Sequence, residues 1–460
     1  MKPKAPSIDS VTTINDDGTH YIIHPSDVRG RFTMLRRVSA VFLIAIYVLL
    51  PFIKINGEPA VFLDVMHRRL HLFGITLMFQ DLWLLFFLIT GLGFSLFLVT
   101  AIFGRIWCGW ACPETVFLEH VFRRVERLID GDAPSRRKLE NAPWTAGKLI
   151  RRGLKHGIYI VLAALIAHLF VSYFVSLPVL YAMTHRSPLE NWSVFLFVAA
   201  LTAVLYFNFA WFREQFCIVL CPYGRLQSAL IDDNSIVVGY DEIRGEPRGK
   251  PGAASGDCID CRRCVQVCPT GIDIRQGLQL ECISCAACVD ACDDVMVRLG
   301  RLPGLIRHDS LNALAGKATR FLRPRLFLYF FLMLIGAGIF LFSTQQVRPV
   351  IASVLRMQGA PYFRDASTVR NNYLLRLANK LSTPQTYTVC IDSPVKSLEV
   401  AEGNNRAIRL EGGEEVQEPL ILSIPDADFQ GQFEVKVLIK SESGVIEVEK
   451  AVPFLGPFRE

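Results

Sequence analysis

The chain has 460 residues, of which 51% are hydrophobic, and it carries 13 cysteines and a formal net charge of +6. A mean hydropathy of +0.33 is too high for an ordinary soluble enzyme of this length, so the composition excludes that class and favours a membrane protein. The basic residues form no patch interleaved with aromatic residues, which argues against a nucleic-acid partner.

Five segments are long and apolar enough, or nearly so, to cross a bilayer, which takes about 20 residues. They are residues 38–53, 82–103, 157–180, 192–212 and 326–343. We expect the first to be retained and not cleaved as a signal peptide, because a long polar tail precedes it and no small-residue cleavage site follows it.

The loops between these spans differ in their content of Lys and Arg. The tail to Arg37 carries six, residues 104–156 carry eleven and residues 213–325 carry fifteen, whereas residues 56–81 carry two and residues 181–191 carry one. Because basic loops stay on the cytoplasmic side, the N-terminus and both long loops are predicted to be cytoplasmic. Everything after Ser343 should then lie on the other side of the membrane.

A short cysteine motif occurs twice, each time at the end of an apolar segment. "IWCGWACPETVF" at 106–117 and "QFCIVLCPYG" at 215–224 share the spacing Cys-x-x-x-Cys-Pro. The cysteines are Cys108, Cys112, Cys217 and Cys221. Residues four apart share one face of a helix, so each pair could direct both sulfurs at one ion. Pro113 and Pro222 should move the preceding cysteine out of helical geometry and begin the next helix.

The two spans before these pairs run in the same direction, so the pairs should lie at a similar depth and could face one another. Four sulfur ligands suit Cu(I), zinc or another iron–sulfur cluster. Arg105, Arg213 and Arg225 border the pairs and are predicted to favour thiolate. The alternative, that these cysteines are small apolar residues at helix ends, explains one pair more readily than two.

The first long loop contains an amphipathic segment. In "ETVFLEHVFRRVERLI", residues 114–129, apolar residues including Val116, Phe122 and Leu128 recur at helical spacing against Glu119, Arg123 and Arg127. This pattern predicts a helix lying on the membrane surface. Residues 130–143 are expected to form a turn-rich loop, and the Gly- and Pro-rich residues 243–257 a linker.

A compact cysteine-rich insert follows, at about residues 258–299. Two runs have the spacing Cys-x2-Cys-x2-Cys-x3-Cys, in which three cysteines bind one 4Fe-4S cluster and the fourth binds the other. We therefore assign Cys258, Cys261, Cys264 and Cys292 to the first cluster and Cys282, Cys285, Cys288 and Cys268 to the second. A zinc ribbon would leave several of these cysteines unused. Asp293 stands where ferredoxins usually have proline, and its charge could lower the potential of the nearby cluster.

From Gln345 onward the pattern changes to short alternating runs between Gly, Pro, Asn and Asp residues. "TYTVCI", "SLEVA", "PLILSI", "FEVKVLI" and "VIEVEKAV" predict strands of a small antiparallel sandwich that serves in binding or as a scaffold. Cys390 is interpreted as a strand residue and not as a redox site. His67 and His71 lie in a loop predicted to be remote from the clusters, and His168 lies within the third span, where a structural or a functional role is open.

The motifs together resemble those of a known family. "GRIWCGWACPETVF", "FCIVLCPYGRLQSAL", "CIDCRRCVQVCPTGIDIRQGLQLECISCAACVDACD" and "GLIRH" resemble the CcoG/FixG/RdxA family of cbb3-type cytochrome oxidase assembly proteins. The resemblance implies a polytopic α-helical membrane protein with a bacterial-type two-cluster ferredoxin insert of α+β type. It also implies an all-β, immunoglobulin-like domain at the C-terminus, on the periplasmic side of a bacterial inner membrane.

The resemblance further implies the activity. Members similar to this chain reduce Cu(II) to Cu(I) in the cytoplasm and supply a copper-exporting P-type ATPase, so the paired cysteines Cys108, Cys112, Cys217 and Cys221 would bind copper. A quinol-linked subunit of the respiratory polyferredoxin type, with a quinone pocket at the pairs, and a non-catalytic assembly scaffold with sensing clusters remain open alternatives.

The expected organisation divides the chain as follows: tail 1–37, four-helix membrane region 38–212 with cytoplasmic loop 104–156, Cys-x-x-x-Cys-Pro segment and linker 213–257, ferredoxin domain 258–299, linker 300–325, fifth span 326–343 and periplasmic domain 344–460. The expected cofactors are two 4Fe-4S clusters, with copper as substrate or bound ion. The expected partners are the lipid bilayer, the copper exporter, oxidase assembly factors, an unidentified electron donor and a second copy in a homodimer.

Overall fold

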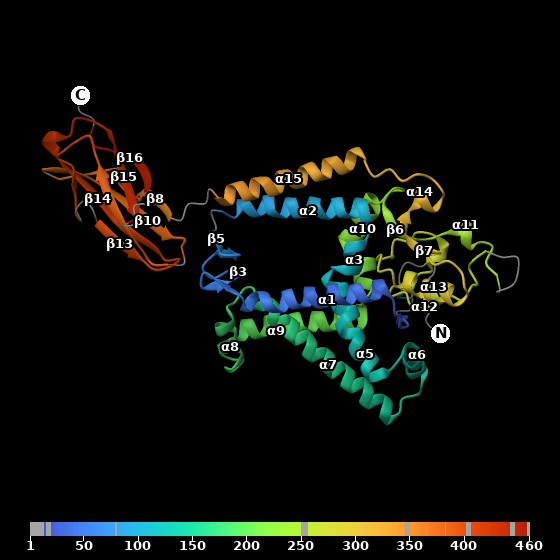
Figure 1. The fold of residues 1–460 in the computed structure, drawn as a ribbon. Coiled ribbons are helices and arrows are strands. Elements are labelled where there is room, and N and C mark those ends of the chain that lie inside the picture. Colours follow the sequence, from blue (N-terminus) through green and yellow to red (C-terminus); the bar gives the residue numbers. More distant parts are fainter. Residues whose placement is uncertain are drawn as a thin grey trace. The chain divides into compact units, whose positions relative to one another are not determined.

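The computed structural model describes residues 13–14, 20–78, 81–249, 256–345, 350–365, 367–381, 383–401, 406–441 and 447–457. Residues 1–12 and 15–19 of the expected N-terminal tail and residues 250–255 of the expected linker lie outside the described residues. The contacts divide the chain into two compact units, one of residues 1–53 and 85–340 and one of residues 54–84 and 341–460 (Figure 1). The loop between the first two spans therefore groups with the C-terminal domain, which the sequence did not predict.

Five helices are long and apolar enough to cross a membrane, as predicted. They are α1 (Arg31–Leu49, continued by the 3-10 turn Leu50–Phe52), α2 (Trp83–Phe103), α7 (Ala146–Val171), α9 (Trp192–Phe207, continued by the π-helix Asn208–Phe212) and α15 (Pro324–Gln345). The predicted third span, 157–180, is displaced. The helix begins earlier, at an N-cap where Thr145 accepts a hydrogen bond from the Lys148 amide, and it ends before the separate helix α8 (Leu177–Thr184).

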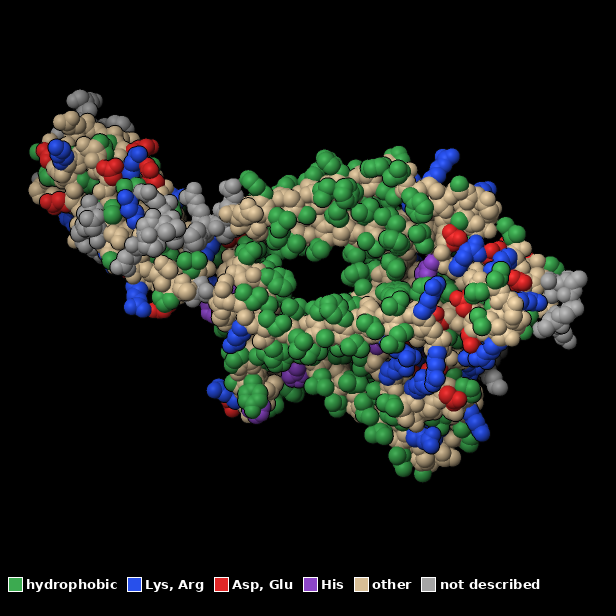
Figure 2. All heavy atoms as spheres, in the orientation of Figure 1, with side chains coloured by type: hydrophobic (Ala, Val, Ile, Leu, Met, Phe, Trp, Pro, Cys, Tyr) green, Lys and Arg blue, Asp and Glu red, His purple; other side chains and the backbone are tan. Residues whose placement is uncertain are grey.

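Small residues and polar contacts join these helices. An added Cβ at Gly336 of α15 would lie 2.8 Å from the Gly91 amide nitrogen of α2, so only glycine permits this backbone approach. Tyr47 of α1 donates a 3.1 Å hydrogen bond to the Ile166 carbonyl of α7. The outer faces of the five helices carry mostly hydrophobic side chains (Figure 2), as lipid-facing surfaces require.

The first long loop is a layer of short helices. These are α3 (Ile106–Trp110), α4 (Pro113–Phe117), the π-helix Leu118–Phe122, α5 (Arg123–Asp130) and α6 (Ala133–Asn141). The predicted helix over 114–129 is confirmed, but its polar face is not free in solvent, because Arg123 is buried while Leu128 is 85% exposed. The prediction of a loop over 130–143 is wrong, because most of this segment forms α6. The side chain of Asp132 caps the helix by accepting a hydrogen bond from the Ser135 amide, and a proline is tolerated in the first turn of a helix.

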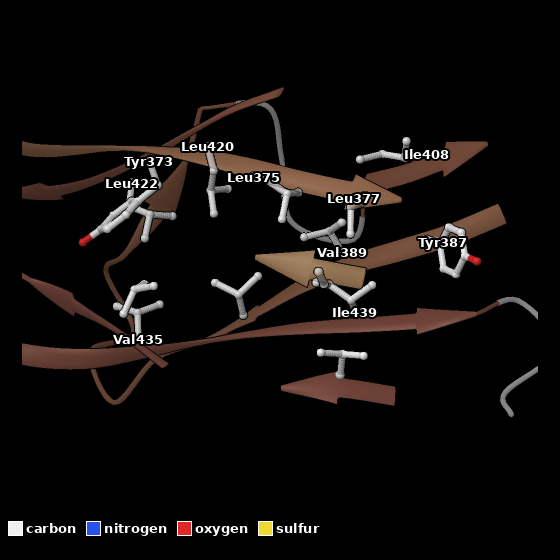
Figure 3. Close-up of a cluster of buried hydrophobic side chains, with 14 of the residues drawn as sticks. Tyr373, Leu375, Leu377, Tyr387, Val389, Ile408, Leu420, Leu422, Val435 and Ile439 are labelled. Atoms are coloured by element: carbon white, nitrogen blue, oxygen red, sulfur yellow. The ribbon is translucent and has the colours of Figure 1, made fainter. Parts of the chain in front are cut away.

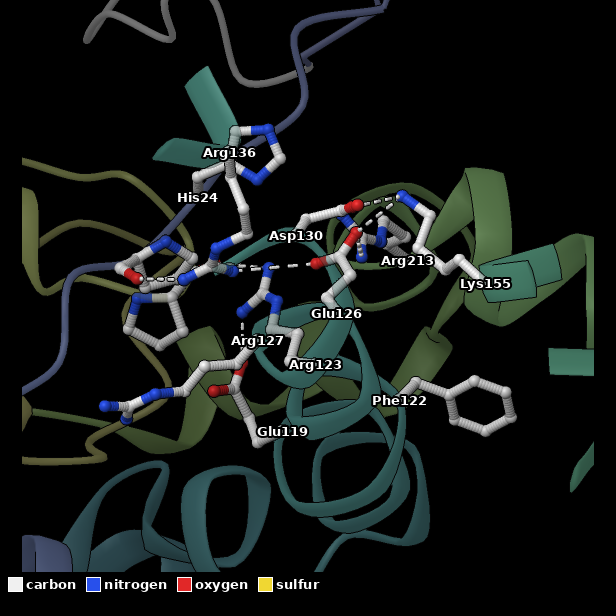
Figure 4. Close-up of polar contacts among 12 residues, drawn as sticks. His24, Glu119, Phe122, Arg123, Glu126, Arg127, Asp130, Arg136, Lys155 and Arg213 are labelled. Atoms are coloured by element: carbon white, nitrogen blue, oxygen red, sulfur yellow. Dashed lines mark hydrogen bonds and ion pairs between the residues drawn. The ribbon is translucent and has the colours of Figure 1, made fainter. Parts of the chain in front are cut away.

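A buried ion network fixes this layer to α7 and α9 (Figure 4). Arg213, only 1% exposed, pairs with Glu126 at 2.8 Å, and Lys155 of α7 pairs with Asp130 at 3.1 Å. Burial alone would raise the pKa of Glu126, but the cations of Arg213 and Lys155 hold it well below its usual range. Removing one partner from such a buried set costs about 3–5 kcal/mol, so the network specifies where the layer sits.

The segment from residue 216 to residue 314 forms the α+β insert. Its elements are the π-helix Phe216–Leu220, α10 (Pro222–Leu230), β6 (Ile236–Tyr240), α11 (Glu242–Gly245), α12 (Arg263–Gln266), the 3-10 helix Ile274–Gln276, α13 (Ala287–Arg298), β7 (Ile306–Ser310) and α14 (Leu311–Leu314). Strands β6 and β7 pair antiparallel with Val238 opposite His308. The two cysteine runs lie between these strands in the sequence.

The second unit contains an all-β sandwich, as predicted. One sheet has the order β12-β14-β10-β8 with β9 beside β10, and the other has the order β13-β11-β15-β16. The strands are β8 (Val350–Arg356), β9 (Phe363–Arg364), β10 (Thr368–Asn379), β11 (Gln385–Asp392), β12 (Glu399–Val400), β13 (Arg406–Leu410), β14 (Glu415–Pro425), β15 (Phe433–Ser441) and β16 (Glu447–Phe454), with the 3-10 turn Asp426–Asp428. Inward side chains of both sheets, among them Leu377, Leu422 and Ile439, form the core (Figure 3). Cys390 lies in β11, as interpreted.

Residues 54–84 add five short strands to this unit. They are β1 (Lys54–Ile55), β2 (Glu58–Pro59), β3 (Val61–Asp64), β4 (Arg69–Leu72) and β5 (Ile75–Met78). The loop after β5 is joined to the sandwich by an ion pair of 2.6 Å between Asp81 and Lys380, both largely buried.

Candidate functional site

The two cysteine runs of the insert share an unusual backbone. Asp260 and Arg262 in the first run, and Ser284 and Ala286 in the second, have positive φ angles of 50° to 57°. These are equivalent positions, on either side of the second cysteine of each run. Non-glycine residues adopt this conformation at a cost, and it turns successive amide groups toward one point, as in the concave loops that hold iron–sulfur clusters.

The arrangement of the cysteines agrees with the crossed assignment. Burial, together with the nearby thiols of Cys264, Cys261 and Cys258, raises the pKa of Cys292 to about 12, so these thiols lie close to it. A small cavity in the insert is lined by Cys268, Cys282, Cys285 and Cys288, the four residues assigned to the second cluster, with Cys264 beside them. The residues therefore fit 4Fe-4S clusters, although the ligand sets stay a prediction.

Each Cys-x-x-x-Cys-Pro motif has the predicted kink. Cys112 and Cys221 are extended N-cap residues with ψ of 127° and 110°, and Pro113 and Pro222 begin α4 and α10. The kinks follow from proline, which keeps the preceding residue out of helical geometry and suits the first turn of a helix.

The two motifs are brought together. Besides burial, Cys112 and Cys221 lie close enough to raise the pKa of Cys108 electrostatically. The other three cysteines of the two motifs likewise raise the pKa of Cys217. All four thiols therefore share one environment, although within the described residues no three Cys, His, Asp or Glu side chains are close enough to hold one ion.

The prediction that neighbouring arginines favour thiolate is wrong for the protein without metal. Burial raises the pKa of Cys108 to about 11, and the nearby Arg105 lowers it less. The Cys108 thiol donates to Gln227 Oε1 at 3.2 Å, and the same oxygen accepts a 2.9 Å bond from Arg105 Nε. Arg213 belongs to the buried network, and Arg225 is exposed and donates to the Val219 carbonyl. Desolvation of the buried Cys108 thiol therefore changes its pKa more than the positive charge of Arg105 does.

Glu114 is a member of this site that sequence reasoning missed. Its Oε2 accepts a 2.7 Å hydrogen bond from Asn208, while its buried Oε1 has no partner in the described part of the chain. Burial raises the pKa of Glu114 to about 7. After burial, the charge of this glutamate is the largest cause that raises the pKa of Cys217. Its position directly after Pro113, in the first turn of α4, was the available signal.

The first Cys-x-x-x-Cys-Pro motif contacts the second cysteine run of the insert through the two residues that follow Cys108. A Cβ added to Gly109 would lie 3.1 Å from both the amide nitrogen and the Cα of Cys285 and would overlap the Ile283 carbonyl oxygen. Trp110 Nε1 donates to the Ser284 carbonyl at 3.2 Å, and Cys108 and Cys285 belong to one buried cluster. The Cys-x-x-x-Cys-Pro site therefore abuts the residues assigned to the second cluster.

A second residue missed from the sequence joins the insert to the first membrane helix. Asp290 of α13 is 5% exposed and accepts hydrogen bonds from the amides of Phe32 and Thr33 at 3.2 and 2.7 Å. It therefore caps the N-terminus of α1 from a remote part of the chain, and a Cβ at Gly30 would overlap its carboxylate.

The three histidines singled out from the sequence have local partners. His67 pairs with Asp64, and His71 of β4 contacts Thr76. His168 bonds through Nδ1 to the Ala164 carbonyl and lines a cavity of about 620 Å³ formed by α7, α8 and α9. None of the paired cysteines lines that cavity.

Comparisons with known proteins identify the relatives of this chain. It is 33% identical to "Nitrogen fixation protein FixG" of Rhizobium meliloti over 82% of this chain and 81% of the relative. It is 36% identical to "Protein RdxA" of Cereibacter sphaeroides over 83% and 84%. The chain belongs to the FixG/RdxA family. A family model described as "IG-like fold at C-terminal of FixG, putative oxidoreductase" matches residues 340–457 of this chain.

Two further family models match the cysteine-bearing regions. A 4Fe-4S dicluster domain matches residues 212–311, and a 4Fe-4S binding domain matches residues 82–138. The chain is thus an iron–sulfur electron-transfer protein of this family. Among solved structures, a FixG-related protein from Vibrio parahaemolyticus is 22% identical over 24% of this chain and 100% of that chain, with a TM-score of 0.22. An α-2-macroglobulin of Escherichia coli is 20% identical over 24% of this chain and 6% of that chain, with a TM-score of 0.18.

Proposed function

We propose that this chain reduces Cu(II) to Cu(I) in the cytoplasm and supplies the product during assembly of a cbb3-type cytochrome c oxidase. One observation carries the proposal. The backbone of Gly109, next to Cys108, packs on the backbone of Cys285, so a soft-metal site lies against the residues assigned to the second cluster. A metal bound by the paired cysteines would then be within short range of an electron source.

The chemistry of the side chains suits this reaction. Reduction adds one electron to Cu²⁺ and forms Cu⁺, and when bound the 4Fe-4S clusters supply electrons singly. Thiolate prefers the cuprous ion, so Cys108, Cys112, Cys217 and Cys221 would stabilise the product more than the substrate. A cuprous ion accepts two sulfur ligands, so one pair of thiols is sufficient to hold it.

The location and partners are part of the proposal. The concentration of Lys and Arg in residues 104–156 and 213–325 supports a cytoplasmic position for the site and a periplasmic position for the sandwich. The family resemblance supports a copper-exporting ATPase and oxidase assembly factors as partners.

One finding favours a second candidate function. The family model for a 4Fe-4S binding domain covers Cys108 and Cys112, so the paired cysteines could bind a further cluster in a subunit that passes electrons from quinol to another acceptor. The cavity near His168 gives the quinol alternative no support at the pairs, since none of the paired cysteines lines it.

The test is anaerobic. Purified protein is reduced, freed of reductant and given Cu(II), while cluster absorbance and a cuprous-specific chelator are followed beside a Cys108→Ser/Cys112→Ser variant. Cluster reoxidation matched by Cu(I) in the wild type, and lost in a variant with the same iron and sulfide content, supports copper reduction at this site. Equal copper reduction by both proteins rejects it. Loss of about one cluster's iron in the variant identifies the second candidate.

A further inference from the structure

A cavity lined by arginines lies beside the insert and has no role in the proposed reaction. Its volume is about 90 Å³, and its walls come from residues 25–28, the first turns of α1, the helical stretch 119–127, α6 and the insert. Six arginines line it: Arg36, Arg37, Arg123, Arg124, Arg127 and Arg136. Figure 2 shows Lys and Arg side chains gathered over the ends of α1 and α5, and Figure 4 shows the guanidinium groups of Arg123 and Arg136 beside one another.

The carboxylates of the described residues balance only part of this charge. Arg123 pairs with Glu119 and Glu214, Arg127 with Asp27, and Arg136 with Glu126. Within the described residues, Arg36, Arg37 and Arg124 make no ion pair. Burial lowers the pKa of His120, which also lines the cavity, to about 4, so this imidazole is neutral at neutral pH. The cavity thus keeps an excess of positive charge.

Several guanidinium nitrogens at the cavity are buried without a partner. Arg36 is 6% exposed, and its Nε donates to the Gly109 carbonyl at 3.0 Å, but its Nη2 has no hydrogen bond in the described structure. The same holds for Nε of Arg37 and of Arg136. A buried donor left unsatisfied on a charged group is costly, and an anion in the cavity would remove that cost.

We propose that this cavity binds a phosphate group. Arginines recognise phosphate through paired, charge-assisted hydrogen bonds, and a 90 Å³ space matches one small tetrahedral anion better than a larger ligand. The phosphate comes from a soluble phosphate compound or from the headgroup of an anionic lipid, because the cavity includes the first turns of α1. The inference is independent of copper chemistry.

The position gives such a phosphate access to the electron-transfer site. Val267, Pro269 and Ala287 of the cavity wall are chain neighbours of Cys268 and Cys288, and Arg36 reaches the Gly109 carbonyl. The charge of Arg36 also acts on Cys285. A bound anion would offset this positive charge and disfavour the addition of an electron nearby, so phosphate should lower the reduction potential of the insert.

The test uses the full chain with its clusters, in detergent and without copper. Inorganic phosphate is titrated at constant ionic strength against sodium chloride, with thermal unfolding and calorimetry as readouts. The Arg37→Gln/Arg124→Gln variant should bind phosphate roughly tenfold or more weakly. Both side chains are partly exposed and make no ion pair in the described residues, so folding should persist. Arg137→Gln, at an exposed arginine of α6 outside the cavity, is the control for loss of a positive charge elsewhere on this surface and should bind like the wild type.

A second arm separates the two sources of phosphate. The same titration is repeated in nanodiscs of phosphatidylglycerol and of phosphatidylcholine. If phosphate binding is suppressed only in phosphatidylglycerol nanodiscs, the proposal is supported and the occupant is a lipid headgroup. If phosphate binds equally in both kinds of nanodisc, the proposal is supported and the occupant is a soluble phosphate. If the wild type gains no stability from phosphate or from phosphatidylglycerol, or if Arg137→Gln loses as much binding as the double variant, the proposal is overturned.

Discussion

Gly109→Ala is expected to slow copper reduction without removing the clusters. The added methyl group would overlap the Ile283 carbonyl oxygen and lie 3.1 Å from the Cys285 amide nitrogen, where ordinary contacts begin at 3.4 Å. The two backbones must therefore separate by about 1 Å, and a misplacement of this size between reacting groups costs up to about 100-fold in rate. Overpacking should also lower the free energy of unfolding by about 1–3 kcal/mol.

The assay is anaerobic stopped-flow mixing of the reduced protein with Cu(II), combined with iron and sulfide analysis and thermal unfolding. Gly93→Ala is the matched control, because a Cβ at Gly93 of α2 meets no atom within 4 Å. It should react and unfold like the wild type. Wild-type rates in a Gly109→Ala variant with intact clusters would show that the contact between Gly109 and Cys285 is not the route to copper.

Three further outcomes follow from the site. Gly30→Ala should displace Asp290 from the N-terminus of α1 and cost about 0.5–2 kcal/mol in thermal unfolding, whereas an unchanged melting temperature would contradict the capping role. Glu114→Gln removes a charge that raises the pKa of Cys217, so alkylation of that thiol at pH 8, read by peptide mass spectrometry, should become faster and not slower. The affinity for Cu(I) should increase by about tenfold per pH unit for each proton displaced. The reason is that burial raises the pKa values of the paired thiols, which must ionise to bind the metal. A chelator competition in which the affinity stays constant from pH 6 to 8 would exclude thiolate ligation.

Hydropathy and cysteine spacing predicted the main features of this protein. Five spans, the α+β insert and the β-sandwich were all expected, because apolar length and the Cys-x2-Cys-x2-Cys-x3-Cys pattern are local properties of the sequence. The proline after each cysteine pair likewise predicted the start of α4 and α10. Features that depend on residues close together in the sequence were therefore predictable.

The misses arise from contacts between distant residues. Strand β10 was not predicted, partly because Asn371 occupies a core position, where it is 1% exposed and bonds the Leu455 backbone. The thiolate prediction failed because the depth of Cys108 depends on packing against the insert, and burial outweighs a neighbouring arginine. Glu114 and Asp290 are ordinary acidic residues in the sequence, and only the fold gives each of them its partner.

The cap on the first membrane helix has a consequence for biogenesis. Asp290 lies 257 positions beyond Thr33 in the chain, between Cys288 and Cys292 of the second cysteine run. Because synthesis proceeds from the N-terminus, α1 is made and can enter the bilayer long before its cap exists. The helix end is then completed only when the insert has folded. A chain that fails to acquire its clusters would leave its first helix uncapped, which offers quality-control proteases a frayed end by which to recognise immature protein.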